Sequence, residues 1–576
     1  MEKDGHISAI EEMVGGPVPD DAVAWDEEVA KFVDDSSGQL LDPDLVAKAR
    51  QEELDWLRKE KVYERVPASE CQGKPLPLKW VDVNKGDHTA PKIRSRLVAK
   101  EIKRAKPLAE QLGADTFAAT PPLESVYALM SAFMTRRERG EVRKMMAAWD
   151  VSRAHFMGKA AREIFVELPE EDKHQPEDEV PMVGRLLRSM YGTQDASQIF
   201  QKDYQCWLKS QGAQFSALCP AVFQVKNMMG LVHGDDFLLV GSEEELRWFD
   251  EILNAKYTAR WEALLGKDGN EAQEMFFLNR LVRYYPDGAE GGERLEIEAD
   301  ARHVDLLVKD FGFDDRTKGC DIPEDKPTQV DFLETERQPC LDAKQSSQFR
   351  SMVMRMAYLS SDRPDLCHSV RTLAGAMKGP KMNDWLKLKK VVRYLLKYPY
   401  LKRIFYKQTL ENAGVIAFSD SDWAGDLKTR RSTSGSVIKF GDHTLLVKGS
   451  SQKVVALSSA ESEYYAMART ATLAEFVRGI FDFWGWRTRS TRLRVDSSSA
   501  KALSERRGVG QSRHIQAKFL WLQDKVAEKE LEVEKIKGPV NDSDLVTKVQ
   551  TRGIIQSHLQ RLGFTVSGRT GHKLIK

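Results

Sequence analysis

Residues 231–241 read LVHGDDFLLVG, and this stretch decides the fold. Two apolar runs typical of β-strands flank a tight turn, residues 233–236, that reads His-Gly-Asp-Asp. Adjacent carboxylates repel each other and lose hydration beside apolar strands, so their placement costs free energy. A plain hairpin turn would explain the Gly-Asp pair, because both residues are common in turns. A metal site would explain the two acids, and the choice between these interpretations depends on the rest of the chain.

Length and composition narrow the class of protein. The 576 residues predict roughly three or four domains. Lys and Arg together number 87, as do Asp and Glu, so attraction to nucleic acid must come from local patches. The six cysteines include no CxxC pair, which argues against a zinc ribbon and a disulfide scaffold and predicts a reducing compartment. No apolar stretch approaches the roughly 20 residues that span a bilayer, and the acidic start is unlike a targeting peptide. We therefore expect a soluble, intracellular protein without a membrane partner.

Elements of both kinds alternate along the chain, which predicts a mixed α/β (α+β) fold. Residues 1–40 are rich in Asp, Glu, Gly and Pro and are expected to be mostly disordered. A helical pattern begins at Pro43, a strand-like KWVDV follows at 79–83, and strands and helices continue to about residue 325. The polar stretch 320–348 predicts a linker, and two helical segments follow it. Residues 412–565 alternate strands and helices, and no internal repeat is found.

Three aspartates are candidates for a two-metal site. Nucleotidyl transfer uses two divalent cations a few ångström apart, and Mg²⁺ prefers hard oxygen ligands. Asp150 ends the apolar run MMAAWD, and Asp235 and Asp236 lie in the turn described above. If these strands are neighbours, the three carboxylates meet. Since successive residues of a strand point to opposite faces, we expect Asp236 to be less central than Asp235.

Six motifs occur in the order RSRLVAK, TFAATPPLESV, WDVSRAHFMGK, IFVELPEED, LLRSMYGTQDAS and HGDDFLLVG. They resemble the reverse transcriptase of copia-type retrotransposons. MAYLSSDRPDL and WLKLKKVVRYLL resemble the stretch that follows it in that family. SDSDWAGDLKTRRSTSGSV, ALSSAESEYYAMA, VDSSSA, SRHI and NDSDLVTK resemble its RNase H. The resemblance covers about residues 42–563 and implies a right-hand polymerase followed by an RNase H-like mixed sheet with helices. The implied segments are fingers and palm at 41–325, a linker and helical thumb or connection-like segment at 326–411, an RNase H-like domain at 412–565 and a basic tail at 566–576.

The resemblance implies roles for residues of the polymerase part. Asp150, Asp235 and Asp236 would be the catalytic, metal-binding acids. Arg96 and Lys100 would approach the nucleotide's phosphates, although a solvated basic face is an equal alternative. Tyr191 and Gly192 would line the templating side, and Phe156 would help to gate the ribose 2′ position. His155 stands where the family has Phe, and His233-Gly234 replace its Tyr-Val, so the chain departs from the pattern at both motifs.

The resemblance implies a second two-metal site in the C-terminal part. Its catalytic, metal-binding acids would be Asp420, Glu463, Asp496 and Asp544. His514 would aid product departure or proton transfer, with a surface histidine as the alternative, and Gln516 replaces the family's usual Asp. Ser458 and Glu461 fit a capping box that opens the helix carrying Glu463. Asp422, Asp426 and Glu461 are expected to be structural or solvated.

Two basic patches are candidates for nucleic-acid contact. Lys390, Arg393 and Lys397 share one face of a predicted helix, opposite an apolar stripe. Lys428, Arg430 and Arg431 follow Asp420 closely in sequence. Such patches bind phosphates and make affinity fall with salt, although a solvated charged face is a common alternative.

The leading hypothesis is an RNA-directed DNA polymerase with RNase H activity that uses two Mg²⁺ or Mn²⁺ per active site. The resemblance implies an RNA template, a DNA primer, dNTPs and RNA–DNA hybrid as partners, together with Gag and integrase of the same element. It also implies action in a cytoplasmic virus-like particle and in the nucleus. No D-[ST]-G protease signature, Cys/His knuckle or integrase core is found, so we expect the C-terminal part of a Pol polyprotein or a truncated insertion. The alternative is a decayed or domesticated copy that binds nucleic acid without catalysis.

Overall fold

The computed structural model describes residues 32–35, 39–86, 90–101, 118–138, 144–173, 178–267, 272–314, 316–326, 328–486, 488, 490–508 and 519–567. The predictions for most of the first 40 residues, for nearly all of the basic tail, and for His514 and Gln516 lie outside these ranges. By its contacts the chain divides into two units. The first comprises residues 1–114 and 158–196 with residue 576, and the second comprises 115–157 and 197–575.

The first unit combines one long helix with two small sheets. Helix α2 (Pro43–Lys59) begins at Asp42, whose side chain accepts hydrogen bonds from the amides of Asp44 and Leu45. Strands β2 (Leu78–Asn84) and β3 (Ile93–Ala99) pair antiparallel. The other sheet has the order β1-β7-β6. Its strands are β1 (Tyr63–Pro67), β6 (Phe165–Val166) and β7 (Met182–Leu186), and the short helix α5 (Glu170–Lys173) precedes β7. The predicted helix from Pro43 and the strand at 79–83 are thus confirmed.

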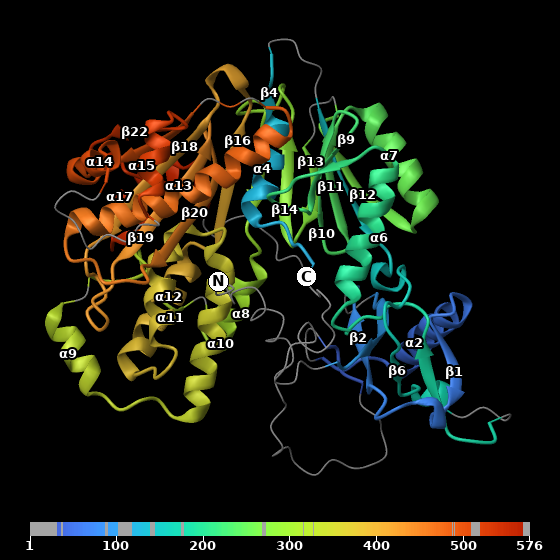
Figure 1. Cartoon of the computed structure of the whole chain (residues 1–576). Helices are drawn as coiled ribbons and strands as arrows, with labels where there is room; N and C mark the ends of the chain where they lie inside the picture. The colour runs from blue at the N-terminus through green and yellow to red at the C-terminus, as the bar shows by residue number, and fades with distance from the viewer. Residues whose placement is uncertain are drawn as a thin grey trace. The chain divides into compact units, whose positions relative to one another are not determined.

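A six-stranded sheet of order β12-β5-β11-β10-β9-β8 organises the first part of the second unit. Its strands are β5 (Met145–Val151), β8 (Gln214–Phe215), β9 (Val222–Val225), β10 (Met228–His233), β11 (Asp236–Gly241) and β12 (Ala259–Leu265). Helices α6 (Ala196–Ser210) and α7 (Glu243–Lys256) cover one face, where Trp149 packs with Phe249 and neighbouring apolar residues (Figure 1). Helix α4 (Leu123–Met134) shares a core cluster with Met146 and Ala148 of the other face.

The middle of the chain adds a second sheet and a group of helices. The sheet has the order β13-β14-β15-β16-β23. Its strands are β13 (Gln273–Phe277), β14 (Arg280–Tyr285), β15 (Arg294–Glu298), β16 (Tyr400–Tyr406) and β23 (Phe564–Ser567). The helices are α8 (Arg302–Asp310), α9 (Gln329–Arg337), α10 (Ala343–Ser360), α11 (Cys367–Ala376) and α12 (Met382–Lys397), with the 3₁₀ turn η4 (Pro364–Leu366). A short parallel pair joins β17 (Gln408–Thr409) to β4 (Thr135–Arg136).

One sequence prediction for this region was wrong. The polar stretch 320–348, predicted as a linker, contains the whole of α9 and the first turns of α10. Thr328 accepts a hydrogen bond from the amide of Asp331 and forms a capping box with it, and Asp342 accepts one from the amide of Gln345. Thr and Asp are common in turns and also at helix N-caps, so the pattern that suggested a loop marks two helix starts.

The C-terminal part is a five-stranded mixed sheet of order β20-β19-β18-β21-β22. Its strands are β18 (Val415–Asp422), β19 (Thr433–Phe440), β20 (His443–Ser451), β21 (Thr491–Val495) and β22 (Leu531–Lys535). Strands β18, β21 and β22 run parallel, whereas β19 and β20 pair antiparallel. The helices are α13 (Ser459–Phe483), α14 (Ser498–Glu505), α15 (Trp521–Ala527), α16 (Asp544–Thr547) and α17 (Arg552–Arg561).

A single hydrophobic cluster runs through the second unit. It includes residues of α4, of β9 to β11, of β13 to β15 and of the C-terminal sheet with α13. The indole of Trp484, next to the end of α13, donates to the carbonyl of Phe223 in β9 at 3.3 Å. The six-stranded sheet and the C-terminal sheet are therefore joined by a shared core.

Two further findings concern the class of protein. All six cysteines are free thiols in the structure. None of the helices in the described ranges combines the length and the apolar character needed to cross a bilayer.

Candidate active sites

The opening motif forms a β-hairpin. His233 ends β10 and is paired with Asp236, the first residue of β11, which leaves Gly234 and Asp235 as a two-residue loop. Gly234 has φ +65°, and no atom lies within 4 Å of where its Cβ would be. Backbone conformation, and not lack of space, therefore favours glycine here. The hairpin interpretation is confirmed, and it leaves both acids at the end of the sheet.

Asp150 lies directly opposite Asp236 in the antiparallel pairing of β5 with β11. Directly opposed residues of neighbouring strands share a face of the sheet, so these two carboxylates are neighbours. Asp235 is tied to the same place, because the amide of Val151 donates to its carbonyl at 3.3 Å. The expected order of the two acids assumed that both lie in one strand, whereas β11 begins at Asp236 and Asp235 belongs to the loop.

The surroundings of Asp236 are strongly acidic. Burial, followed by the charges of Asp150, Asp235 and Glu262, raises the pKa of Asp236 to about 7. Glu262 comes from β12, next to β5 in the sheet, and no sequence motif had pointed to it. Carboxylates that raise one another's pKa values in this way provide the oxygen ligands that a divalent cation prefers.

The residues that follow Asp150 are placed differently from expectation. His155 Nε2 lies 4.0 Å from Asp235 Oδ1 and 3.3 Å from Ser197 Oγ. Phe156, predicted to gate the ribose 2′ position, is instead fully buried in the 3₁₀ turn η3 (Ala154–Phe156). Burial removes its apolar ring from water, and His155 is the side chain that remains near the acids. The ring of Phe156 is therefore not placed to contact a sugar.

The candidate nucleotide-binding residues lie in the first unit. The guanidinium of Arg96 in β3 stacks on the ring of Tyr191 at 4.9 Å, and Tyr191 itself is buried. Gly192 has φ +86°, and a Cβ there would lie 1.9 Å from the carbonyl oxygen of Ala99. Lys100 follows β3 directly and is exposed. The motifs RLVAK and YG, distant in sequence, are thus packed against each other.

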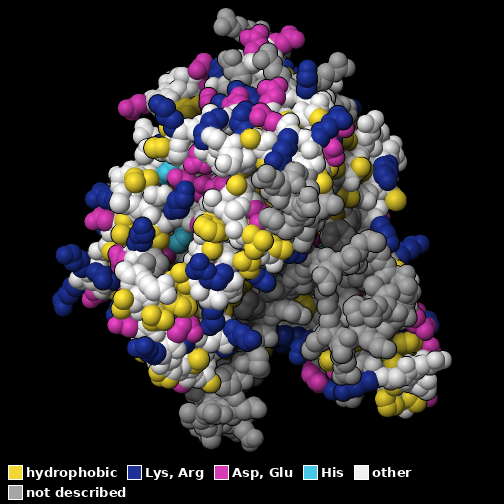
Figure 2. Space-filling view, turned by 60° about the vertical axis from the view of Figure 1, so that its left-hand side comes forward, with side chains coloured by type: hydrophobic (Ala, Val, Ile, Leu, Met, Phe, Trp, Pro, Cys, Tyr) yellow, Lys and Arg dark blue, Asp and Glu magenta, His cyan; other side chains and the backbone are white. Residues whose placement is uncertain are grey.

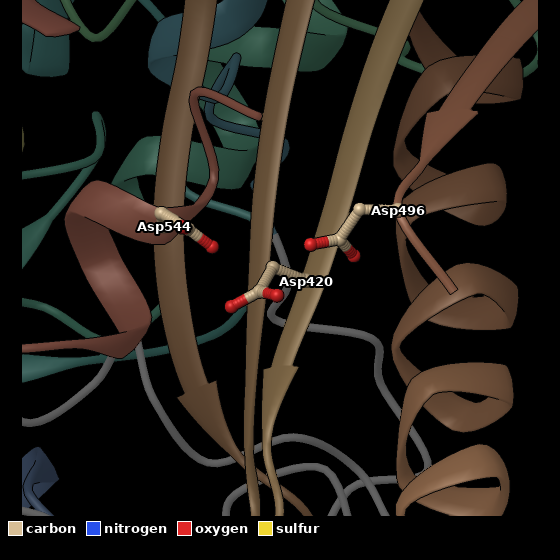
Figure 3. A group of neighbouring side chains, drawn as sticks. All are labelled: Asp420, Asp496 and Asp544. Atoms are coloured by element: carbon tan, nitrogen blue, oxygen red, sulfur yellow. The ribbon is translucent and has the colours of Figure 1, made fainter. Parts of the chain in front are cut away.

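A second acid cluster lies at one end of the C-terminal sheet. Asp420 lies in β18, Asp496 follows β21, and Asp544 begins α16. Each offers a carboxylate oxygen, and these oxygens lie within 4.8 Å of one another. Figure 3 shows the three side chains converging from β18, from the residue after β21 and from the first residue of α16. Within the described ranges, no other set of three acidic, histidine or cysteine ligands reaches this spacing.

Glu463 of α13 completes the set of four acids. Burial, followed by the charges of Asp420 and Asp496, raises the pKa of Glu463 to about 9. Its Oε2 atom is buried without a hydrogen-bond partner. Burial and Asp420 likewise raise the pKa of Asp544 to about 6. A buried, unpartnered carboxylate oxygen beside three converging carboxylates fits a divalent cation such as Mg²⁺ or Mn²⁺.

The three neighbouring acids have local roles. Asp422 accepts from the amide of Thr433, and Asp426 accepts from the amides of Lys428 and Thr429. Glu461 accepts from the amide of Leu457 at 2.7 Å and from the hydroxyl of Tyr465. Only half of the predicted capping box forms: Ser458 accepts from the Glu461 amide, whereas the Glu461 carboxylate binds Leu457.

The two basic patches differ in ion pairing and in solvent exposure. Lys390 pairs with Asp325, Lys397 pairs with Asp321 at 2.7 Å, and Arg393 donates to the carbonyl of Lys318. This arrangement favours the alternative interpretation, a charged face neutralised by the chain itself. Lys428, 3.4 Å from Glu336, is exposed, as are Arg430 and Arg431. On the face drawn in Figure 2, Lys and Arg side chains are interspersed with acidic ones.

Comparison with known proteins assigns a family to part of the chain. Residues 60–266 match the family described as "Reverse transcriptase (RNA-dependent DNA polymerase)". The chain is 25% identical over 527 residues to the "Retrovirus-related Pol polyprotein from transposon TNT 1-94" of Nicotiana tabacum, which covers 88% of this chain and 37% of that protein. The chain contains a copia-type Pol reverse transcriptase region, and the portion that follows it aligns with the same polyproteins. It is also 23% identical over 518 residues to the corresponding polyprotein from transposon RE1 of Arabidopsis thaliana, which covers 87% of this chain and 32% of that protein.

The chain spans about a third of the length of the curated relatives that it matches. Among solved structures, a foamy viral protease-reverse transcriptase in complex with double-stranded DNA matches with a TM-score of 0.45 and 11% identity, over 85% of this chain and 69% of that chain. A foamy viral protease-reverse transcriptase in complex with an RNA/DNA hybrid matches with a TM-score of 0.44 and 11% identity, over 86% of this chain and 54% of that one.

Proposed function

We propose that this copia-type Pol chain is an RNA-directed DNA polymerase whose active site is the acid group Asp150, Asp235 and Asp236. The observation that carries the proposal is the pairing of Asp150 with Asp236 across β5 and β11, with Asp235 in the adjoining loop. The match of residues 60–266 to the reverse transcriptase family supports the same assignment.

The acids would hold two divalent cations, Mg²⁺ or Mn²⁺, which activate the attacking hydroxyl and neutralise the leaving group. The 3′ oxygen of a DNA primer would attack the α-phosphorus of a dNTP, the bond to pyrophosphate would break, and the hydroxyl proton would pass to solvent. The chain's own contribution is positional: two paired strands fix Asp150 and Asp236 side by side, so little reorganisation is needed during the reaction.

We further propose that the C-terminal cluster is a ribonuclease H site. Asp420, Glu463, Asp496 and Asp544 would hold two cations. Water would attack a phosphorus of the RNA strand in an RNA–DNA hybrid, the bond from that phosphorus to the 3′ oxygen would break, and this oxygen would take up a proton as the leaving hydroxyl. The convergence of three carboxylates, with a fourth buried beside them, supports this role. Exposed Arg430 and Arg431 would contact the hybrid's backbone.

The proposal also assigns parts of the chain. Residues 41–325 would provide fingers and palm, residues 326–411 the helical thumb or connection, and residues 412–565 the RNase H-like part. Arg96, Lys100, Tyr191 and Gly192 would bind nucleotide and template. We expect the protein to act inside cells, with Gag and integrase of its element, in a cytoplasmic virus-like particle and in the nucleus.

The test uses the full chain with an RNA template, a DNA primer and Mg²⁺. We expect primer extension by the natural protein and a loss of at least about 100-fold in Asp235→Asn, because charge at this position is needed to hold cations. Hybrid binding, measured by fluorescence anisotropy, should change less than about threefold, since phosphate contacts elsewhere provide most of the affinity.

Cleavage of the RNA strand is measured in the same preparation. Asp420→Asn with Asp496→Asn should remove cleavage and leave extension intact, whereas Asp235→Asn should do the reverse. A folded chain that binds hybrid but neither extends a primer nor cuts RNA would show that this copy has decayed and would refute the proposal.

A further inference from the structure

Lys548 reaches into the C-terminal acid cluster. Its Nζ lies 3.2 Å from Asp420 Oδ1 and 2.7 Å from Asp544 Oδ1. The preceding residue, Thr547, donates its hydroxyl to the other oxygen of Asp420. An ammonium group therefore contacts two of the three carboxylates whose oxygens converge within 4.8 Å.

The two ends of this ion pair differ in exposure. The side chain of Asp420 is 1% exposed, whereas that of Lys548 is 43% exposed. A buried carboxylate without a counter-charge is strongly destabilising. A lysine ammonium on a flexible, half-exposed stem is well hydrated and can turn into solvent without crossing the core. The acid is thus fixed, and its partner can leave.

The acids on the other side of Lys548 are already paired with other residues. There it lines a cavity of about 10 Å³ together with Glu324, Asp365 and His368. Glu324 is already paired with His368 and Ser369, and Asp365 is paired with Arg363. The charge of Lys548 is therefore directed to Asp420 and Asp544.

We propose that Lys548 is the internal counter-ion of this acid cluster and sets how tightly the cluster binds a divalent cation. The ammonium neutralises Asp420 and Asp544 before a cation binds, and it competes with the cation for the same oxygens. Lys548 is thus a positioning residue that sets the cation concentration at which the site becomes loaded. This inference rests on the proposed assignment of the cluster as a metal-dependent site.

The experiment measures Mn²⁺ binding to the full chain by isothermal titration calorimetry. All proteins carry Asp150→Asn and Asp236→Asn, so that binding reports on the C-terminal cluster. Lys548→Met should bind Mn²⁺ about tenfold more tightly, because the competing charge is gone. Without metal it should melt several degrees lower, because Asp420 and Asp544 lose the ammonium group that neutralises them.

Lys548→Arg tests the inference in the opposite direction and does not depend on the Met variant folding. Arg pairs with carboxylates in a bidentate manner, so it should weaken Mn²⁺ binding severalfold while keeping the melting temperature without metal. Lys525→Met is the matched control, because Lys525 pairs with Glu528 and Glu530. The carbonyl of Glu530 accepts a hydrogen bond from the amide of Thr491, the first residue of β21. Asp496 follows the other end of β21, so it lies roughly 16 Å from Thr491 along the strand. The control should leave Mn²⁺ affinity unchanged.

Unchanged Mn²⁺ affinity in both Lys548 variants would overturn the inference, even if the melting temperature fell, because Lys548 would then be only structural. A different failure points to the proposed site itself: no Mn²⁺ binding with Lys548 intact, or binding that survives Asp420→Asn. The two failures are distinguishable because the second appears before Lys548 is changed.

Discussion

The environment of one carboxylate, Asp236, links the fold to the chemistry. It faces Asp150 across two strands and receives the additional charges of Asp235 and Glu262. An ionised Asp236 is therefore disfavoured while no cation is bound. In the proposed polymerase site, the same repulsion would be relieved when a cation binds.

This environment predicts a pH dependence of stability in EDTA. The pKa of Asp236 rises from 3.8 to about 7 on folding, so between these values the folded protein holds a proton that the unfolded chain has released. The stabilisation is present below pH 4 and is lost as the pH rises towards 7. From pH 5 to pH 8 the free energy of unfolding of the natural protein should fall. In Asp236→Asn this fall should be smaller by up to about 3 kcal/mol. Urea unfolding at both pH values measures it, and parallel pH profiles for the two proteins would contradict it.

At the scale of elements, the end of β3 is packed against the turn that carries Tyr191 and Gly192. The amide of Ala99 donates to the carbonyl of Tyr191 at 2.8 Å, and the backbone of Gly192 lies against the Ala99 carbonyl. Because there is no room for a side chain at Gly192, the motif can approach β3 this closely. The packing brings Arg96 and Tyr191 into contact.

Two glycines with the same φ angle allow the two reasons for glycine at residue 192, its backbone conformation and its lack of a side chain, to be tested separately. Gly192 and Gly212 both have φ +86°, but only Gly192 has atoms within 4 Å of its virtual Cβ. Gly212→Ala should cost about 1–2 kcal/mol for the left-handed conformation alone. Gly192→Ala should cost clearly more and raise the KM for dNTP, because β3 must move. Equal losses in the two variants, measured by urea unfolding and primer extension, would show that the contact with Ala99 is unimportant.

The same scale shows what sequence could and could not predict. The hairpin at 231–241 was predictable because alternating apolar runs and a Gly-Asp turn are local signals. The gathering of acids from residues 420 to 544 was suggested only by resemblance, since their approach depends on how parallel strands order themselves. Glu262 was not predicted because a single acid in an edge strand has no motif. Helix α9 was missed because its capping residues are also turn residues.

For the whole molecule, the shared core means that the six-stranded sheet and the C-terminal sheet of the second unit are coupled. Trp484 is fully buried and lies in the core cluster that also contains residues of α4. Its indole donates a hydrogen bond to the carbonyl of Phe223 in β9. A change in this core should therefore weaken both acid sites. An isolated fragment of residues 412–565 would expose this face to water.

Trp484→Ala should lower the free energy of unfolding by about 3–5 kcal/mol. Amide hydrogen exchange in β5 and β18 should lose protection together, because the two strands belong to one cooperative core. Trp423→Ala is the matched control: Trp423 is 54% exposed in the same unit and should cost less than about 1 kcal/mol. Loss of protection in β18 alone would mean that the parts unfold separately.

The pairing of β23 with β16 has a consequence for biosynthesis. Residues 400–403 of β16 pair with residues 564–567 of β23. One edge of β16 therefore stays unpaired until more than 160 further residues have been synthesised and have left the ribosome. Growing chains fold from the N-terminus, and unpaired strand edges recruit other chains. The nascent protein therefore has a long interval in which self-association competes with completion of this sheet. Slower translation of residues 407–563 should lengthen that interval, and binding of a chaperone to the exposed edge of β16 should raise the yield of native protein.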